Sequence, residues 1–250
     1  MKILILGGTG YIGKIVQDLL LKKNYQVYSL GTKTCPSFKI GEKNNLDIIN
    51  EIDFVFYFAW YFNTNDKNYF SKNINSLVEV LKVCKKKDIP LIFLSTLFAS
   101  RFSQSLYNRA KAECEILVNS YNQRFIRFGA VLVEGYKLEG FYGKISNFVS
   151  KYRIFPVIYP NKKIFFTTSI NELNLLINNF TNKEFVKINL INPFPQFLSE
   201  LINVNKKFYF KFPIYWRILY FFVKLFEIFK IPLNFRSDSF LAIWGKNEYN

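Results

Sequence analysis

The sequence predicts an α/β protein built on a doubly wound parallel sheet with a small C-terminal lobe. Three observations predict it: short apolar runs alternate with stretches of helical periodicity, the connections are short, and a glycine-rich turn joins the first apolar run to the first helix. Alternation of this kind places parallel strands in one sheet with helices on both faces. Half of the 250 residues are hydrophobic, which is enough to bury a large core.

The expected elements alternate through the first half of the chain. Strands are expected at 2–6, 26–30, 37–40, 54–59, 91–94 and 125–131, and helices at about 11–22, 69–87 and 106–120. The run 54–59 is continuously apolar and aromatic, as in a strand buried on both faces. Beyond about residue 135 the alternation weakens. We therefore expect residues 1–170 to form the core, and residues 171–250 to form a small substrate lobe while completing that core.

Four of the eleven glycines lie in one turn, Gly7-Gly8-Thr9-Gly10-Tyr11-Ile12-Gly13, directly after the first strand. In such a turn the glycines permit the tight bend, a close approach of backbone to a pyrophosphate, and close packing of helix on strand. Free N–H groups at the helix start then bind the phosphates. The turn predicts a Rossmann-type dinucleotide site, with these contact residues: Gly7, Thr9, Gly10, Tyr11, Ile12 and Gly13.

The chain is strongly basic, with 34 lysines and arginines against 18 aspartates and glutamates and a net charge of +16. Such a surplus can indicate nucleic acid, a membrane surface or a phosphorylated substrate as partner. The basic residues are scattered, however, and the densest run, Lys85-Lys86-Lys87, lies where cations complement the end of a helix. We therefore expect no dedicated nucleic-acid surface.

Histidine is absent, and the three cysteines, Cys35, Cys84 and Cys114, lie far apart. The composition excludes a histidine base, a histidine metal ligand and a Ser-His triad. The cysteine spacing gives neither a disulfide framework nor a local zinc signature, so we expect no metal. A reducing cytoplasm is the compartment that this cysteine usage favours.

The aromatic stretch 213–231 raises the question of membrane contact. Its longest unbroken apolar run, 218–223, is six residues, whereas a spanning helix needs about 20. Polar residues recur within it at spacings of three and four, as a narrow stripe: Arg217, Tyr220, Lys224 and Glu227. We expect a mostly buried helix with one wet edge, and peripheral membrane contact is the less favoured alternative.

Tyr107 and Lys111 lie four residues apart in an expected helix, so their side chains share one face. A nearby ammonium group favours the phenolate and lowers a tyrosine pKa that starts near ~10. This makes Tyr107 a usable acid or base in a protein without histidine. The same spacing occurs at Tyr220 and Lys224, but only Tyr107 follows a strand that ends in hydroxyl residues, Ser95 and Thr96.

Together these motifs resemble the extended short-chain dehydrogenase/reductase family, and within it the nucleotide-sugar epimerase/dehydratase/reductase branch. The similar residues are the glycine turn, Phe58-Ala59, Ser95-Thr96, Tyr107-x-x-x-Lys111 and Ile126-Arg127-x-Gly129, with a weaker similarity at Arg236-Ser237-Asp238-Ser239. The resemblance implies an NAD(P)-dependent enzyme acting on a nucleotide sugar, with Ala59 near the cofactor.

The resemblance also implies roles for individual side chains. Tyr107 is the implied catalytic acid/base, and Lys111 lowers its pKa and binds the nicotinamide ribose. Thr96 orients the substrate oxygen, with Ser95 as the fallback. Asn73 supports the active site, and the helices around Asn73 and Tyr107 pair in a homodimer.

The preference for NAD or NADP is set at the end of the second strand, where an acidic residue would bind the ribose 2′-hydroxyl of NAD. Here Gly31 is followed by Thr32 and Lys33. A missing carboxylate with a nearby cation favours NADP(H) modestly, and NAD(H) stays open. Thr32 and Lys33 are therefore further expected cofactor contacts.

The expected reaction follows from the residues after Thr96. Sugar 4,6-dehydratases of the resembling family carry Asp-Glu there, whereas this chain has Leu97-Phe98, which cannot move a proton. The 3,5-epimerising enzymes use a histidine, which this chain lacks. What remains is 4-keto reduction or 4-epimerisation by tyrosine-assisted hydride transfer. A non-catalytic dinucleotide-binding protein on the same fold is the alternative.

Overall fold

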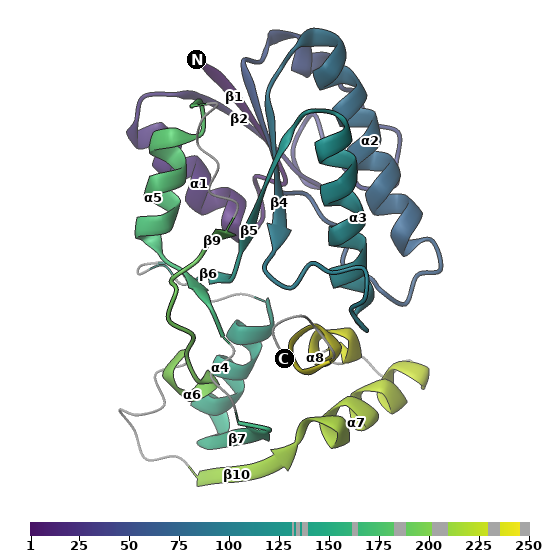
Figure 1. The fold of residues 1–250 in the computed structure, drawn as a ribbon, viewed down its shortest axis with the longest axis vertical. Helices are drawn as coiled ribbons and strands as arrows, with labels where there is room; N and C mark the ends of the chain where they lie inside the picture. The colour runs from purple at the N-terminus through teal and green to yellow at the C-terminus, as the bar shows by residue number, and fades with distance from the viewer. Residues whose placement is uncertain are drawn as a thin grey trace.

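A parallel sheet lies at the centre of the larger part of the molecule (Figure 1). The computed structural model describes residues 1–131, 133, 136, 140–161, 165–182, 189–201, 210–229 and 236–245. The strand order is β2-β1-β3-β4-β5-β9, and every neighbouring pair is parallel. The strands are β1 (Lys2–Leu6), β2 (Gln26–Leu30), β3 (Phe54–Tyr57), β4 (Leu91–Thr96), β5 (Arg124–Phe128) and β9 (Asn189–Leu190). The predicted parallel α/β fold is confirmed.

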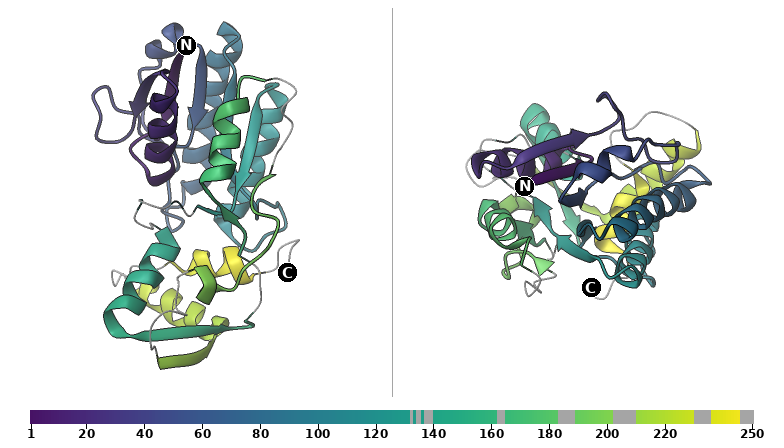
Figure 2. Two further views of the ribbon diagram at one scale, coloured as in Figure 1. Left: turned by 90° about the vertical axis from the view of Figure 1, so that its left-hand side faces the viewer. Right: turned by 90° about the horizontal axis from the view of Figure 1, so that it is seen from above.

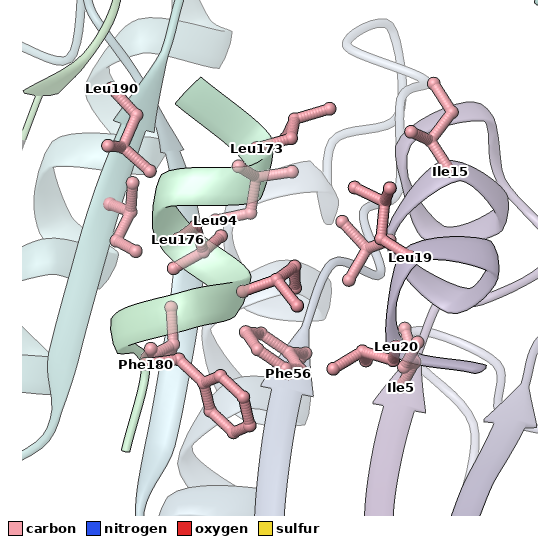
Figure 3. Packing of buried hydrophobic residues seen from close by; sticks show 14 of the residues in the cluster. Ile5, Ile15, Leu19, Leu20, Phe56, Leu94, Leu173, Leu176, Phe180 and Leu190 are labelled. Atoms are coloured by element: carbon pink, nitrogen blue, oxygen red, sulfur yellow. The ribbon is translucent and has the colours of Figure 1, made fainter. Parts of the chain in front are cut away.

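Helices cover both faces of this sheet because its strands alternate apolar side chains between two cores. Ile3 and Ile5 of β1 enter the core under α1 (Tyr11–Lys22) and α5 (Ile170–Asn179), which Figure 3 shows from close by. Leu4 and Leu6 enter the opposite core, under α2 (Tyr69–Lys87) and α3 (Leu106–Ser120). A short 3-10 helix, η1 (Asp47–Glu51), packs beside α2. The chain order reverses beside β1, which is the switch point where such sheets bind ligands.

One predicted strand, Ser37–Ile40, is wrong. The segment forms a turn and a loop, in which the Phe38 N–H donates to the Gly31 carbonyl (3.0 Å) and the phenyl ring is buried. Within the same turn the Thr34 hydroxyl donates to the Pro36 carbonyl (2.6 Å) and accepts from the Gly31 N–H (3.0 Å). The chain therefore folds back onto the end of β2 instead of running beside it.

The smaller lobe lies beyond the carboxyl ends of the central strands (Figures 1 and 2). It contains α4 (Gly140–Tyr152), β7 (Ile154–Tyr159), α6 (Leu198–Leu201), β10 (Phe210–Tyr215), α7 (Trp216–Ile228) and α8 (Ser237–Trp244). Strands β7 and β10 pair in parallel, and a buried hydrophobic cluster from the other five elements forms the core of the lobe, with Ile214 of β10 packed against it. The short pair β6 (Ala130–Val131) and β8 (Thr167–Thr168) connects the two parts.

Segments of the lobe and segments of the central core alternate along the chain on both sides of residue 170, where the boundary was expected. Helix α4 and strand β7 precede that position but pack in the lobe. Helix α5 and strand β9 follow it but complete the sheet and its core, because β9 pairs with β5 and because Leu173, Leu176 and Leu190 are buried in the same cluster as residues of β1 and β3. The chain therefore crosses between the two parts several times.

Helix α7 is more exposed than the sequence predicts, because a mostly buried helix with one solvent-exposed edge was expected. Only Trp216 and Val223 of α7 are fully buried, and most of its apolar side chains face outward. Tyr220 and Glu227 of the predicted polar stripe instead face the lobe, where Glu227 accepts from Ser237. No helix in the described ranges is long and apolar enough to cross a membrane.

Candidate active site

The glycine turn closes the carboxyl end of β1 and is tied to the end of β2. Gly7 has a φ of +88°, a backbone conformation that glycine adopts readily and other residues rarely adopt. Its N–H donates to the Leu30 carbonyl (2.7 Å). The Gly8 N–H donates to the same carbonyl (3.1 Å). Helix α1 then starts at Tyr11 with Gly10 as its N-cap and no side-chain cap.

Close backbone packing explains two of these glycines. A Cβ at Gly13 would lie 2.4 Å from the Gly7 carbonyl oxygen, so α1 can approach the turn only without a side chain there. A Cβ at Gly7 would lie 2.5 Å from the backbone nitrogen of Ala59. Gly10 differs, because its nearest contact would be 3.3 Å away. A bare backbone at an uncapped helix start fits the pyrophosphate of a dinucleotide.

The end of β2 carries no carboxylate. A Cβ at Gly31 would lie 2.2 Å from the hydroxyl oxygen of Thr9, so the side chain of Thr9 occupies the place that an acidic residue would need. Thr32 and Lys33 follow on the exposed surface, and Lys33 forms no ion pair with any residue in the described part of the chain. The cation is available to an anionic ligand.

Asn73 of α2 fixes the loop that follows β3. Its side-chain oxygen accepts from the Tyr61 N–H (2.9 Å), and its amide donates to the carbonyls of Tyr61 (3.1 Å) and Tyr69 (3.0 Å). The side chain is buried with all of these bonds made. Asn73 thereby sets the positions of the two aromatic residues on either side of Tyr61, which are Trp60 and Phe62.

Tyr107 lies between these two aromatic residues. The Phe62 ring stacks on Tyr107 with centroids 6.4 Å apart, and the Trp60 ring meets it edge to face at 5.8 Å. Tyr107 is half-buried. The pKa of Tyr107 is raised above its ordinary value, mainly by burial of the phenol and to a smaller extent by the negative charge of Asp238. The pKa is thus shifted opposite to the lowering that the sequence predicted from Lys111, whose ammonium group is directed to the Leu94 carbonyl.

Lys111 lies below Tyr107 on the same face of α3, with its Nζ 5.9 Å from the Tyr107 ring centroid. The ammonium group donates to the Leu94 carbonyl (2.6 Å) and lies 3.9 Å from the centre of the Trp60 ring. Only 3% of Lys111 is exposed, and this burial lowers its pKa to about 7. At neutral pH the side chain therefore exists in both the charged and the neutral form.

Strand β4 ends beside this pair. Thr96 is its last residue and is half-buried, whereas the hydroxyl of Ser95 is buried and has no partner among the described residues. Leu97 is buried and Phe98 is half-buried, so apolar side chains follow Thr96 in the structure as in the sequence. The site therefore presents hydroxyl groups without an adjacent carboxylate.

The N-terminus of α3 is held by a carboxylate from the C-terminal lobe. Asp238 of α8 accepts from the Ser105 hydroxyl (2.8 Å), the Leu106 N–H (2.8 Å) and the Tyr107 N–H (3.3 Å). The Asn108 side chain donates to the Ala242 carbonyl of the same helix (3.2 Å). A carboxylate at this end of a helix is favoured by the helix dipole. The lobe thus positions the first turn of α3, which carries Tyr107.

A family model described as the NAD dependent epimerase/dehydratase family matches residues 3–154, which is more than half of the chain. The chain belongs to this family. A search of curated proteins finds no match. Solved structures with the same fold include enzymes of three reaction types, each less than 20% identical to this chain.

Three of these structures each align with at least 86% of this chain. dTDP-4-dehydrorhamnose reductase from Bacillus anthracis, in complex with NADP, is 13% identical with a TM-score of 0.66, and the match covers 96% of this chain and 97% of the reductase. dTDP-glucose 4,6-dehydratase from the same organism, in complex with NAD, is 15% identical with a TM-score of 0.66 and coverages of 86% and 84%. UDP-glucose 4-epimerase from Thermotoga maritima, with UDP-glucose, is 16% identical with a TM-score of 0.65 and coverages of 86% and 85%.

The structure brings most of the expected site residues of this epimerase/dehydratase family member to one edge of the sheet. The glycine turn follows β1, Ala59 follows β3, Thr96 ends β4, and Tyr107 and Lys111 lie on α3 beside it. Sequence reasoning missed Trp60 and Phe62, whose loop has no periodic pattern. It noticed Asp238 only as a weak motif and gave it no role.

Proposed function

We propose that this chain is an NAD(P)-dependent oxidoreductase that acts at C4 of a nucleotide-activated sugar in the cytoplasm, by 4-keto reduction or by 4-epimerisation. One observation carries the proposal: Tyr107 and Lys111 share a face of α3 beside the hydroxyl-bearing end of β4. Their arrangement supplies a proton donor and a cation next to a site built for a dinucleotide. Thr96 is proposed to orient the substrate oxygen.

The residues after Thr96 distinguish this chain from a dehydratase. Eliminating water from a sugar requires one group to remove a proton and another to protonate the leaving hydroxyl. Leu97 and Phe98 can do neither. Hydride transfer at a single carbon needs only one proton, which Tyr107 can donate.

Tyr107 can serve a reduction in the form that the structure shows. A bound nicotinamide would supply the hydride, and the ketone oxygen must receive a proton from the protein. A protonated phenol is the form that donates, and burial shifts the pKa of Tyr107 toward that form. Epimerisation at C4 would use the same side chain first as a base and then as an acid.

The proposed cofactor is NADP(H). Thr9 fills the position beside Gly31 where a carboxylate would bind the ribose 2′-hydroxyl of NAD, and Lys33 is exposed without an ion pair in the described part of the chain. A cation there complements a 2′-phosphate. The structurally similar reductase was solved with NADP, which agrees with this preference.

Turnover tests the proposed chemistry. The purified chain should oxidise NADPH when supplied with nucleotide 4-keto sugars, and Tyr107→Phe should lower kcat by a factor of about 10²–10⁴, as expected for loss of a general acid. Tyr220→Phe is the matched control, because Tyr220 and Lys224 repeat the spacing on α7 far from the glycine turn. Full turnover by Tyr107→Phe would refute the assigned role.

A non-catalytic dinucleotide-binding protein is the second candidate, and the position of Lys111 favours it. The ammonium group donates to the Leu94 carbonyl and packs on Trp60, and no hydrogen bond among the described residues joins it to the Tyr107 hydroxyl. This candidate predicts stoichiometric binding of NADPH, measured by fluorescence, with no hydride transfer to any keto sugar. A single productive substrate would eliminate it.

We also propose a homodimer formed by α2 and α3, the helices that carry Asn73 and Tyr107. Light scattering coupled to size exclusion would give twice the mass of the chain. Lys82→Glu and Ile116→Asp, which change exposed positions on these helices, would convert the dimer to a monomer. A monomer in the wild type would refute the proposal.

A further inference from the structure

The outer edge of the C-terminal lobe exposes an unusual concentration of large apolar side chains. Strand β10 and helix α7 form this edge, at the far end of the molecule from β1 (Figures 1 and 2). We call it the β10–α7 face. Its exposed apolar residues are Phe210, Phe212, Tyr215, Ile218, Phe221, Phe222, Phe226, Ile228 and Phe229.

These side chains point outward because the other side of α7 already fills the lobe core. Trp216 and Val223 are buried there, with Leu219 and Tyr220 packed beside them. Ile218, Phe221 and Phe222 recur at spacings of three and four and so share the opposite side of the helix. Phe221 is 61% exposed and Phe222 is 50% exposed. Helix α7 is therefore amphipathic with its more apolar side toward solvent.

The chain segments that form this face, or that pair with it through β7, carry almost only positive charges. The lobe segments 140–161 and 210–229 contain six cationic side chains: Lys144, Lys151, Arg153, Lys211, Arg217 and Lys224. Their only carboxylate is Glu227, whose side chain is 11% exposed, accepts from Ser237 and forms an ion pair with Lys224 (3.7 Å), which is 45% exposed. By helical spacing, Arg217 and Lys224 lie along one border of the apolar side of α7.

We infer that the β10–α7 face docks on the surface of an anionic phospholipid bilayer. Exposed aromatic and aliphatic side chains bordered by cations are what an interfacial helix presents to the acyl chains and headgroups of such a membrane. The 13 residues of α7 are too few to cross it, so the helix lies in the interface. The proposal is independent of the reaction at Tyr107.

Charge complementarity selects the bilayer over other occupants. A second copy of the chain would bring two strongly cationic faces together, whereas anionic headgroups neutralise these cations. Single-stranded nucleic acid would use stacking rings in a basic groove, but here aliphatic residues such as Ile218 and Ile228 interleave with the rings on the outside of a helix.

Vesicle flotation of the full chain tests this inference. Vesicles of phosphatidylcholine mixed with phosphatidylglycerol should carry the protein upward, and vesicles of phosphatidylcholine alone should carry much less. Phe221→Ser with Phe222→Ser should lower the fraction bound by about tenfold or more, because two apolar side chains no longer enter the bilayer. Arg217→Gln with Lys224→Gln should abolish the preference for the anionic lipid.

The control removes exposed apolar side chains that lie outside the β10–α7 face. Leu21 is 48% exposed on α1 and Phe102 is 88% exposed between β4 and α3, so Leu21→Ser with Phe102→Ser should leave flotation unchanged. Circular dichroism of each variant verifies folding. Equal flotation with both vesicle types, or no flotation of the wild type, would overturn the inference. So would a dimer that Phe221→Ser with Phe222→Ser dissociates in the absence of lipid, or competition by single-stranded RNA.

Discussion

Asp238→Ala is expected to destabilise the protein through the first turn of α3, because a buried carboxylate of the C-terminal lobe holds that turn. Truncation leaves the Leu106 N–H, the Tyr107 N–H and the Ser105 hydroxyl without their acceptor. Losing an N-terminal cap costs about 0.5–2 kcal/mol, and each polar group left unsatisfied in a buried site costs about 1–3 kcal/mol. Because water can reach the partly buried N–H groups, we expect a total of about 2–4 kcal/mol.

Two measurements separate this effect from a general loss of stability. Calorimetry should show a lower Tm, by about 6–12 °C for a loss of about 3 kcal/mol in a chain of this length. Hydrogen exchange should show faster exchange at the Leu106 and Tyr107 amides than at amides of α1. Ser239→Ala on the same turn of α8 is the control, since Ser239 is half-buried and its change leaves the carboxylate in place. A Tm within 1–2 °C of the wild type, or about 0.5 kcal/mol, would refute the reasoning.

Three further predictions concern the cofactor site and the buried lysine. Gly13→Ala should lower both stability, by about 1–3 kcal/mol, and NADPH affinity, because its Cβ would meet the Gly7 carbonyl oxygen at 2.4 Å. Gly10→Ala, whose Cβ would lie 3.3 Å from the same oxygen, should cost less stability, about 1 kcal/mol for the change of N-cap residue, and should lower NADPH affinity in titration calorimetry. Lys33→Glu should weaken NADPH binding by about tenfold or more relative to NADH, whereas Lys23→Glu at the exposed end of α1 should change neither. Burial lowers the pKa of Lys111 from 10.5 to about 7, so the unfolded chain binds more protons between these values and wild-type stability should rise with pH across this window. Urea unfolding should show that Lys111→Met is more stable than the wild type below pH 7, by about 3–5 kcal/mol. This difference in unfolding free energy should shrink as the pH approaches 10.5. A difference that does not change with pH would contradict the burial of the charge.

Local sequence patterns predicted the elements that carry the site. The glycine turn, the helix over Tyr107 and Lys111 and the buried strand ending at Thr96 depend on residues a few positions apart. Their spacing determines which side chains share a face or a strand end. Parallel order then brings the strand ends to one edge of the sheet.

Contacts between distant segments could not be predicted in this way. Asp238 caps α3 across more than 130 residues of chain, and no local pattern records such a partner. Trp60 packs on Lys111 because Asn73 fixes the loop after β3 that carries Trp60, and that loop has no periodic sequence pattern. Ser37–Ile40 has the composition of a strand, but the burial of Phe38 under a turn outweighs it.

Helix α7 shows a different limit of sequence reasoning. Its apolar content led to the expectation of burial, but burial requires a partner surface, and the lobe core accepts only one side of the helix. The number of apolar residues in a helix therefore does not determine whether its second face is covered within the chain.

Transfer of deuterium from the nicotinamide C4 position of labelled NADPH to the sugar tests the central claim most directly. Mass spectrometry of the product should show one deuterium at the reduced carbon for the wild type. Tyr107→Phe should bind labelled NADPH with unchanged affinity but form product at least about 10² times more slowly. Absence of deuterium from every product would contradict 4-keto reduction, and equal transfer by Tyr107→Phe would contradict the assignment of Tyr107 as the proton donor in a hydride transfer.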